Sequence, residues 1–425
     1  MDCRFLQLKD CLSMITNGFV VKQSRDSNKA GGYPFTRIET LSNGKFNRDR
    51  MGYADIYNLD GLESYILDDE DILISHINSR RFLGRSVLYK KEEDEIILHG
   101  MNVLRVKTNR TVLNPVYANY LFQTSYYKNC IDNIRKDAIN QSSFSIGDFQ
   151  NLVIPVPDID YQNKIATVLS SLDSKISLNQ AINRNLEALA KQLYDYWFVQ
   201  FDFPDENGKP YKSSGGKMVW NEVLKREIPE GWEVKSIGDV AEVYNGATPS
   251  TEDEQNYGGD IVWITPKDLS NQQEKFVYQG ERNISQKGYD SCSTHLLPLN
   301  TILMSSRAPI GLLAIAKSEL CTNQGFKSFV PKNKSMSTYL YYYLQTHKKQ
   351  VEQFGTGTTF KEVSRDDILS FNIIVPEDKI LEKWEEILSP INNKQLELQK
   401  ETSSLTRQRD ELLPLLMNGQ VEVGN

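Results

Sequence analysis

Mostly apolar residues recur at alternating steps of four and three in the segment IATVLSSLDSKISLNQAINRNLEALAKQLYDYW, residues 165–197. These positions are Ile165, Leu169, Leu172, Ile176, Asn179, Asn183, Leu186, Ala190, Leu193 and Trp197. Steps of four and three are the heptad spacing that lines up side chains along one side of an α-helix. The segment therefore predicts a long helix whose apolar seam packs against a partner helix.

A second segment near the C-terminus has the same pattern, displaced by 219 residues from Ile165 to Trp384. Its seam consists of Trp384, Leu388, Ile391, Gln395, Leu398, Thr402, Leu405, Arg409, Leu412 and Leu416. One displacement fits the whole stretch, so the two helices contain no relative insertion. They most simply pack against each other antiparallel, each about 60 Å long at about 1.5 Å per residue. The polar seam positions, such as Asn179 and Gln395, would fix the register of this coiled-coil spacer.

The segments before the two helices also resemble each other. LDDEDILIS (67–75) matches LPLNTILMS (297–305), YANYLFQT (117–124) matches YLYYYLQT (339–346), NLVIPVP (151–157) matches SFNIIVP (370–376), and Gly84 falls near Gly311. A repeat this long exceeds the period of solenoid proteins and indicates two copies of a domain. We therefore predict a first domain (1–157), a central spacer helix (158–200), a linker (201–230), a second domain (231–376) and a C-terminal spacer helix (377–418).

Composition excludes several classes of protein. No apolar run approaches the roughly 18 to 20 residues that span a bilayer, and charges interrupt the N-terminus, so we expect a cytoplasmic protein. The five cysteines form an odd set without CxxC spacing, and the four histidines have no metal-ligand spacing. We therefore expect neither disulfides nor a metal site.

The charge distribution leaves DNA binding open. A net charge of -7 argues mildly against it, because phosphate contacts need clustered Lys and Arg. Basic runs nevertheless occur, such as Arg80, Arg81, Arg85, Lys90 and Lys91 with no acid among them. A solvated surface is the ordinary alternative for such a run.

The end of the central helix, LYDYWFVQF (193–201), is unusually aromatic, and its counterpart is LLPLLM (412–417). Both carry more apolar surface than a two-stranded seam needs. One interpretation is packing on the adjacent globular domain, and the other is a docking face for a partner protein. The candidate partner-binding residues are Tyr194, Tyr196, Trp197, Phe198, Leu415 and Met417.

With its duplication and paired helices, the chain resembles a specificity (S) subunit of a Type I restriction-modification enzyme. The resemblance rests on LAKQLYDYWFVQFDFP (189–204), IPEGWEVKSIGDVAEVYNGATPS (228–250) and CTNQGFKSFVP (321–331) in this order, and covers nearly the whole chain. It implies two mixed α/β (α+β) target-recognition domains, each reading half of a split double-stranded DNA target, with the helices setting the gap.

The resemblance also implies partners. Two adenine methyltransferase (M) subunits would dock on the helical region, and restriction (R) subunits would join them. S-adenosylmethionine, ATP and Mg are expected only on those partner subunits, so this chain would have no cofactor and no catalytic residue. The sequence agrees, because NPVY (114–117) lacks the second proline of a methyltransferase motif and is better explained by Asn114 as a helix N-cap. GTGTTF (355–360) lacks the features of a phosphate-binding loop.

Direct readout of DNA favours Arg or Lys on guanine and Asn or Gln on adenine. In the first domain the loop SHINSRRFLGR (75–85) supplies Asn78, Arg80, Arg81 and Arg85, and its counterpart SSRAPIG (305–311) supplies Ser305, Ser306 and Arg307. Further candidates are Lys29, Arg37, Lys267, Thr358, Thr359 and Lys361. The main alternative function is a duplicated coiled-coil adaptor that binds only proteins. A second alternative is a self-sufficient methyltransferase.

Overall fold

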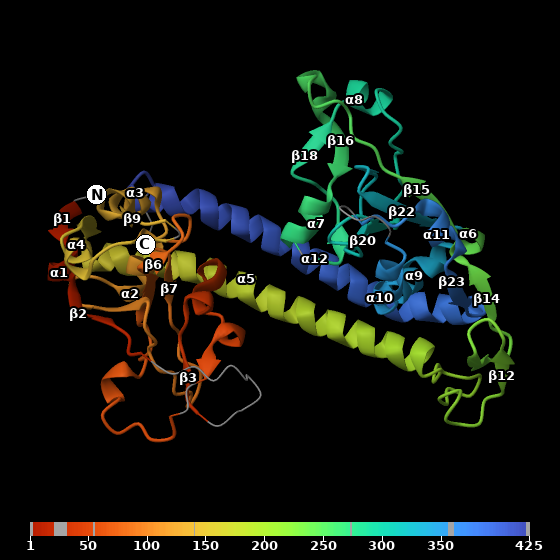
Figure 1. The fold of residues 1–425 in the computed structure, drawn as a ribbon, viewed down its shortest axis with the longest axis horizontal. Coiled ribbons are helices and arrows are strands. Elements are labelled where there is room, and N and C mark those ends of the chain that lie inside the picture. Colours follow the sequence, from red (N-terminus) through yellow and green to blue (C-terminus); the bar gives the residue numbers. More distant parts are fainter. Residues whose placement is uncertain are drawn as a thin grey trace. The chain divides into compact units, whose positions relative to one another are not determined.

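The computed structural model describes residues 3–20, 32–53, 56–139, 141–272, 274–355 and 361–421 (Figure 1). The chain divides into two compact units, which are residues 1–178 with 403–425 (unit 1) and residues 179–402 (unit 2). The division cuts both long helices, α5 (Ile159–Tyr194) and α12 (Asp378–Met417). Each unit therefore contains one globular domain and a part of each long helix.

Unit 1 is built on a four-stranded antiparallel sheet in the order β2 (Leu12–Asn17), β8 (Val103–Thr108), β5 (Ile72–Ser75) and β7 (Ser86–Leu88). Successive side chains of a strand point to opposite faces. Ile72 and Ile74 accordingly enter a core with α2 (Pro115–Leu121), α3 (Ser125–Ile134), α4 (Ile146–Gln150) and the start of α5. Leu73 enters a second core on the other face with Leu41 and Tyr89.

The domain of unit 1 is closed by its own ends, because β1 (Cys3–Gln7) pairs antiparallel with β11 (Val153–Pro157) directly before α5. Asn114 caps α2 by accepting hydrogen bonds from the backbone N–H groups of Val116 and Tyr117, with Pro115 in the first turn, which confirms the N-cap expected there. The remaining elements are α1 (Leu8–Cys11), β3 (Pro34–Phe35), η1 (Ile38–Gly44), η2 (Arg48–Arg50), β4 (Gly52–Tyr53), η3 (Glu63–Tyr65), β6 (Ile77–Asn78), β9 (Lys136–Asp137) and β10 (Ser142–Ser143).

Unit 2 repeats this plan. Its main sheet has the order β15 (Ala241–Asn245), β22 (Phe326–Pro331), β19 (Ile302–Ser305), β20 (Leu313–Ala316) and β17 (Phe276–Val277). The first four strands correspond in order to β2, β8, β5 and β7, and β14 (Glu233–Ser236) pairs with β23 (Asn372–Val375) as β1 pairs with β11. The predicted duplication is therefore confirmed at the level of sheet topology.

Unit 2 contains further elements outside this shared plan. A second sheet joins β18 (Arg282–Ile284), β16 (Tyr257–Ile264) and β21 (Cys321–Thr322), and a hairpin joins β12 (Met218–Asn221) to β13 (Arg226–Pro229). The π-helical turn η4 (Asp195–Val199) follows α5. The other helices are α6 (Ile237–Val240), η5 (Glu254–Asn256), α7 (Pro266–Gln272), α8 (Gln286–Asp290), η6 (Lys334–Met336), α9 (Ser337–Thr346), α10 (Lys348–Gln353) and α11 (Arg365–Ser370).

The two long helices run antiparallel in both units. In unit 1, Arg409 of α12 donates a hydrogen bond from Nη1 to Asp173 of α5 over 2.8 Å. In unit 2, Asn179 donates to Glu401 over 2.8 Å, and Gln395 donates to Glu187 over 3.1 Å. Three polar seam positions, Asn179, Gln395 and Arg409, thus bind the opposite helix. The seam residues of both helices are buried or half-buried, as the heptad pattern predicts.

Lys275 connects the globular domain of unit 2 to the α5 and α12 segments of the same unit. Its ammonium group is buried and donates to Tyr342 Oη over 2.6 Å and to Asn392 Oδ1 on α12 over 2.8 Å. It also lies 3.4 Å from the carboxylate of Glu187 on α5. Burial lowers the pKa of Lys275 to about 8, although the nearby Glu187 carboxylate favours the charged form. This network orients the domain on its helices.

A buried ion pair in unit 1 joins Arg105 of β8 to Asp71, the residue before β5. Arg105 on β8 is 1% exposed and donates from Nε to Asp71 over 2.6 Å, and a second guanidinium nitrogen donates to the Ser64 carbonyl over 2.9 Å. We expect Arg105→Ala to lower the free energy of unfolding by about 3–5 kcal/mol, because it removes the guanidinium that donates to the buried Asp71 carboxylate and leaves only Lys107, 4.0 Å away, to offset its charge. Urea unfolding of the full chain checks this. The double variant Arg105→Met with Asp71→Leu should recover much of the loss, and a loss below about 1 kcal/mol in Arg105→Ala would contradict the assignment.

Within the ranges described, no helix is long and apolar enough to cross a membrane.

Candidate nucleic-acid interface

The loop that follows β5 in unit 1 is a tight turn that presents arginines. The Gly84 N–H donates to the Ser75 carbonyl over 2.7 Å, and the Ser75 N–H donates to the Arg85 carbonyl over 2.9 Å, so the two ends of the turn are held together. Gly84 has a φ of 77°, and a Cβ there would come within 2.8 Å of the Ile131 side chain. Glycine is therefore required at this position.

Three guanidinium groups lie on this turn. Arg80 and Arg81 are exposed, and the Arg81 and Arg85 guanidinium carbons lie 5.5 Å and 4.6 Å from the centre of the Phe82 ring. Burial, and secondarily the charge of Arg81, lower the pKa of the half-buried Arg85 guanidinium. The turn thus concentrates positive charge on an aromatic support. The amide of Asn78, by contrast, is used within the loop, since it donates to Ser75 Oγ and accepts from the Ser79 N–H.

The corresponding loop of unit 2 has the same closure. The Gly311 N–H donates to the Ser305 carbonyl over 2.9 Å, and Gly311 has a φ of 78°. Arg307 is half-exposed and donates from Nε to Glu362 over 2.9 Å, and Lys327 lies 3.3 Å from the same carboxylate. Gly84 and Gly311 therefore occupy equivalent places, as their sequence match predicts.

Two candidates in this loop are inaccessible. Ser305 and Ser306 are both fully buried, and Ser305 Oγ donates to the Pro309 carbonyl over 2.6 Å while accepting from the Leu312 N–H over 2.8 Å. Ser305 thus shapes the loop, and neither hydroxyl group can contact DNA in this structure. The prediction that Ser305 and Ser306 contact DNA is therefore wrong, because both side chains are buried. Ser305 ends a buried strand, and its hydroxyl group closes the turn.

The other candidates are scattered over the surface. Arg37 is 3.6 Å from Glu39, Lys267 is 2.6 Å from Glu281, and Lys361 is exposed. Exposed pairs of this kind add little stability, so these cations can exchange their partners for phosphate at small cost. Lys29, Thr358 and Thr359 lie outside the described residues.

Most of the candidate partner-binding residues are buried. Tyr194, Trp197 and Phe198 pack in the core of unit 2, with Phe198 lying 5.0 Å from Trp384 and 4.7 Å from Tyr339 between ring centres. Met417 is buried in the core of unit 1, and Leu415 is half-buried. The docking interpretation is therefore wrong for Tyr194, Trp197 and Phe198, and packing on the adjacent domain is the correct alternative for these three side chains. Tyr196 remains 38% exposed.

Sequence reasoning missed a cationic group on the second sheet of unit 2. The Arg282 guanidinium on β18 stacks on the Tyr257 ring of β16 at 4.3 Å, and the nearby Lys287 lies 2.7 Å from Asp253. Tyr257 and Arg282 are brought together only by strand pairing, so their spacing in the sequence carried no signal. Over the described parts of the chain, no group of three or more His, Cys, Asp or Glu side chains could hold a metal ion.

Comparison with known proteins identifies the chain. A family model for the Type I restriction modification DNA specificity domain matches residues 2–188 and again residues 229–406. The chain therefore belongs to this family and carries its domain twice. It is a DNA specificity subunit of a Type I restriction-modification system, which recognises the DNA target and is not itself a catalyst.

Individual relatives agree with this assignment. The putative type I restriction enzyme MjaX specificity subunit of Methanocaldococcus jannaschii is 30% identical over 432 residues, which cover 99% of this chain and 94% of the relative. The HindI specificity subunit of Haemophilus influenzae is 25% identical, over 93% of this chain and 96% of the relative. The crystal structure of the S subunit from M. genitalium has the same fold, with a TM-score of 0.64, 16% identity and coverage of 98% and 96%.

Proposed function

We propose that the two globular domains each read one half of a split, asymmetric DNA target, and that the paired helices set the length of the unread gap. The observation that carries this proposal is the repeated sheet order, with a glycine-closed turn at the same place in both domains. Two copies of one scaffold with different loops suit two different short sequences on one DNA molecule.

The proposed reading surface is different in the two domains. In unit 1 it is the turn that carries Arg80, Arg81 and Arg85, whose planar guanidinium groups suit guanine edges or phosphates. In unit 2 it includes Arg307, which is paired with Glu362. The secondary candidates for phosphate contacts are Arg37, Lys267 and Lys361, together with Lys29, Thr358 and Thr359.

We further propose that the chain works in the cytoplasm with methyltransferase subunits, two per chain, and with restriction subunits. S-adenosylmethionine, ATP and Mg would bind those subunits and not this chain. The duplication supports a count of two, because each unit offers one equivalent set of elements to a partner.

Salt dependence of DNA binding tests this function against a protein-only adaptor. Each neutralised phosphate contributes about -0.9 to the slope of log affinity against log salt concentration. For the full chain we expect retention on duplex DNA that falls steeply as salt rises, with a slope of about -3 or steeper. Absence of retention even at low salt would favour the adaptor. Titration with S-adenosylmethionine should show no binding to the isolated chain, and binding would support a self-sufficient methyltransferase.

A further inference from the structure

Unit 1 contains an open groove of about 640 Å³ that the DNA-reading surface does not use. It lies between β1, β11, the α2–α3 junction and the end of α12, and its lining includes Cys3, Phe5, Tyr126, Pro155 and Leu413, as well as Met417. Phe5 is 66% exposed and Tyr126 is 40% exposed. Large side chains of this kind on a folded surface indicate a binding site for another molecule when they gather in one place.

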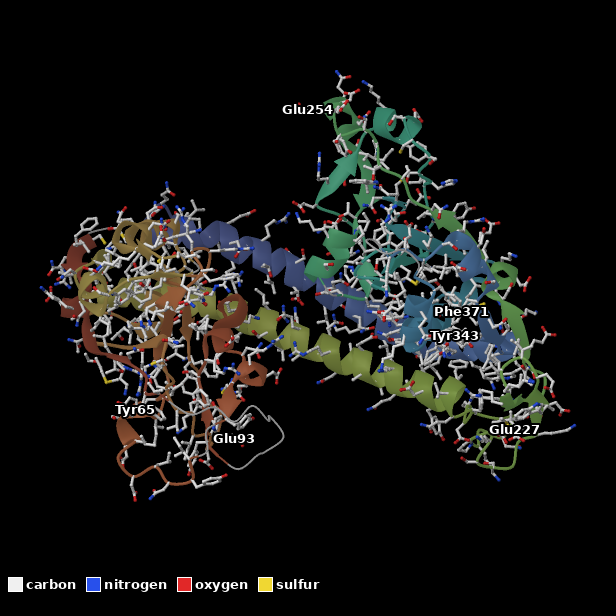
Figure 2. All side chains as sticks on the ribbon, viewed as in Figure 1. Tyr65, Glu93, Glu227, Glu254, Tyr343 and Phe371 are labelled. Carbon is white, nitrogen blue, oxygen red and sulfur yellow. The ribbon has the colours of Figure 1, made fainter. Side chains whose placement is uncertain are left out.

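The equivalent place in unit 2 shows what such a groove accommodates. The sequence matches that align α2 with α9 and β11 with β23 place Leu121 over Tyr343 and Pro155 over Ile374. Tyr343 and Phe371 line a smaller pocket there, of about 370 Å³. Both side chains are labelled in Figure 2. The hairpin of β12 and β13 also borders that pocket, through Leu224 and Arg226. The chain's own linker therefore forms part of the wall of the pocket in unit 2.

Aromatic side chains of the same linker are packed against unit 2. Phe201 is 1% exposed and Phe203 is 5% exposed, and their ring centres lie 5.5 Å and 5.0 Å from that of Trp232. Tyr211 stacks on Phe203 at 4.7 Å. Phe201 and Phe203 thus bury their rings at alternate positions shortly after η4.

The register of the closing strands relates Trp232 to unit 1. The 219-residue displacement places Val375 of β23 over Val156 of β11. Their partners Glu233 and Arg4 are therefore equivalent, and so are the preceding residues, Trp232 and Cys3. The small Cys3 side chain therefore stands in the groove where unit 2 has a tryptophan. In unit 1 the described residues that follow α12, 418–421, carry no aromatic side chain, although Asn418 and Gly419 line the groove and the Val421 carbonyl accepts a hydrogen bond from Tyr161.

We propose that this groove, called the unit 1 groove, binds a segment of a partner protein that carries two aromatic side chains at alternate positions, as Phe201 and Phe203 do. A second copy of the chain is the poorer occupant, because its own Phe201 and Phe203 are already buried. The partner is a methyltransferase subunit, and this identification rests on the function proposed above.

A peptide with the sequence of residues 200–214, labelled with a fluorophore, probes the groove of the full chain. We expect saturable binding in fluorescence anisotropy, and at least tenfold weaker binding of the same peptide with both phenylalanines replaced by alanine. Phe5→Glu in the full chain should weaken peptide binding at least tenfold, because it places a charge at the groove. Trp220→Glu is the matched control, since Trp220 is 57% exposed on the hairpin, and it should leave peptide binding unchanged.

Absence of saturable binding to the unaltered chain, or equal binding by Phe5→Glu, would overturn the proposal. In the assembled complex, Phe5→Glu should weaken the affinity for the methyltransferase subunit at least tenfold, and unchanged assembly would also overturn it. Sedimentation should show a monomer. A dimer that Phe5→Glu dissociates would contradict the proposal by making a second copy the occupant. DNA retention by Phe5→Glu should remain normal, so failure of this inference is distinguishable from failure of the DNA-reading function.

Discussion

Insertion of seven residues into each long helix, between Leu178 and Asn179 in α5 and between Thr402 and Ser403 in α12, is expected to lengthen the gap in the DNA target. Seven residues are one heptad, so the seam continues in phase, and they add about 10 Å to each helix. At about 3.4 Å per base pair the gap should grow by about three base pairs. Mapping of methylated sites in cells that carry the altered complex measures the change.

Both half-sites should keep their bases in that experiment, because the insertion touches neither globular domain. The matched control places seven residues in α5 alone. The pair Asp173–Arg409 and the pair Asn179–Glu401 lie on opposite sides of the inserted residues, so both pairs cannot form when only α5 is lengthened. We expect this variant to lose methylation. An unchanged gap after the double insertion, or altered bases in either half-site, would contradict the role of the helices as spacer.

Replacement of both Arg80 and Arg81 with alanine should weaken binding of the intact complex to its target by about 2 kcal/mol or more, about thirtyfold. Each arginine in a good base contact contributes about 1–3 kcal/mol of discrimination, and both side chains are exposed, so the fold should tolerate their loss. Arg85 is left in place because its guanidinium packs on Phe82. Titration of a duplex carrying the mapped target measures the affinity.

The control for the arginine variant is Lys217→Ala with Lys225→Ala, which removes two charges from exposed side chains on the hairpin. Its affinity should fall less than threefold. If the two double variants lose affinity equally, the turn after β5 contributes only general charge, and its assignment as a reading surface is wrong.

The parts of the fold that could be predicted are those fixed by local periodicity and by internal comparison. The heptad steps from Ile165 to Trp197 predict α5, and their displaced copy predicts α12. The match of Gly84 with Gly311 predicts the equivalent turns, because only glycine readily adopts the positive φ found at both. Each of these features depends on neighbours in the sequence or on the other copy.

The errors concern burial, which depends on residues distant in the sequence. The sequence alone allows Trp197 and Phe198 either to pack on a domain or to bind a partner, whereas in the structure Trp384 and Tyr339 cover them. Ser305 looked available because it belongs to a polar loop motif, yet it completes a strand in the middle of the sheet. The stacking of Arg282 on Tyr257 likewise arises only from strand pairing.

The claim that each domain reads one half of a split target is tested most directly by exchanging residues 1–157 for the matching domain of another specificity subunit and mapping methylated sites. The unaltered chain should give a target of two short sequences separated by unread bases. The exchanged chain should change one of these sequences and preserve the other and the gap. A contiguous target, or a change in both sequences, would contradict the account.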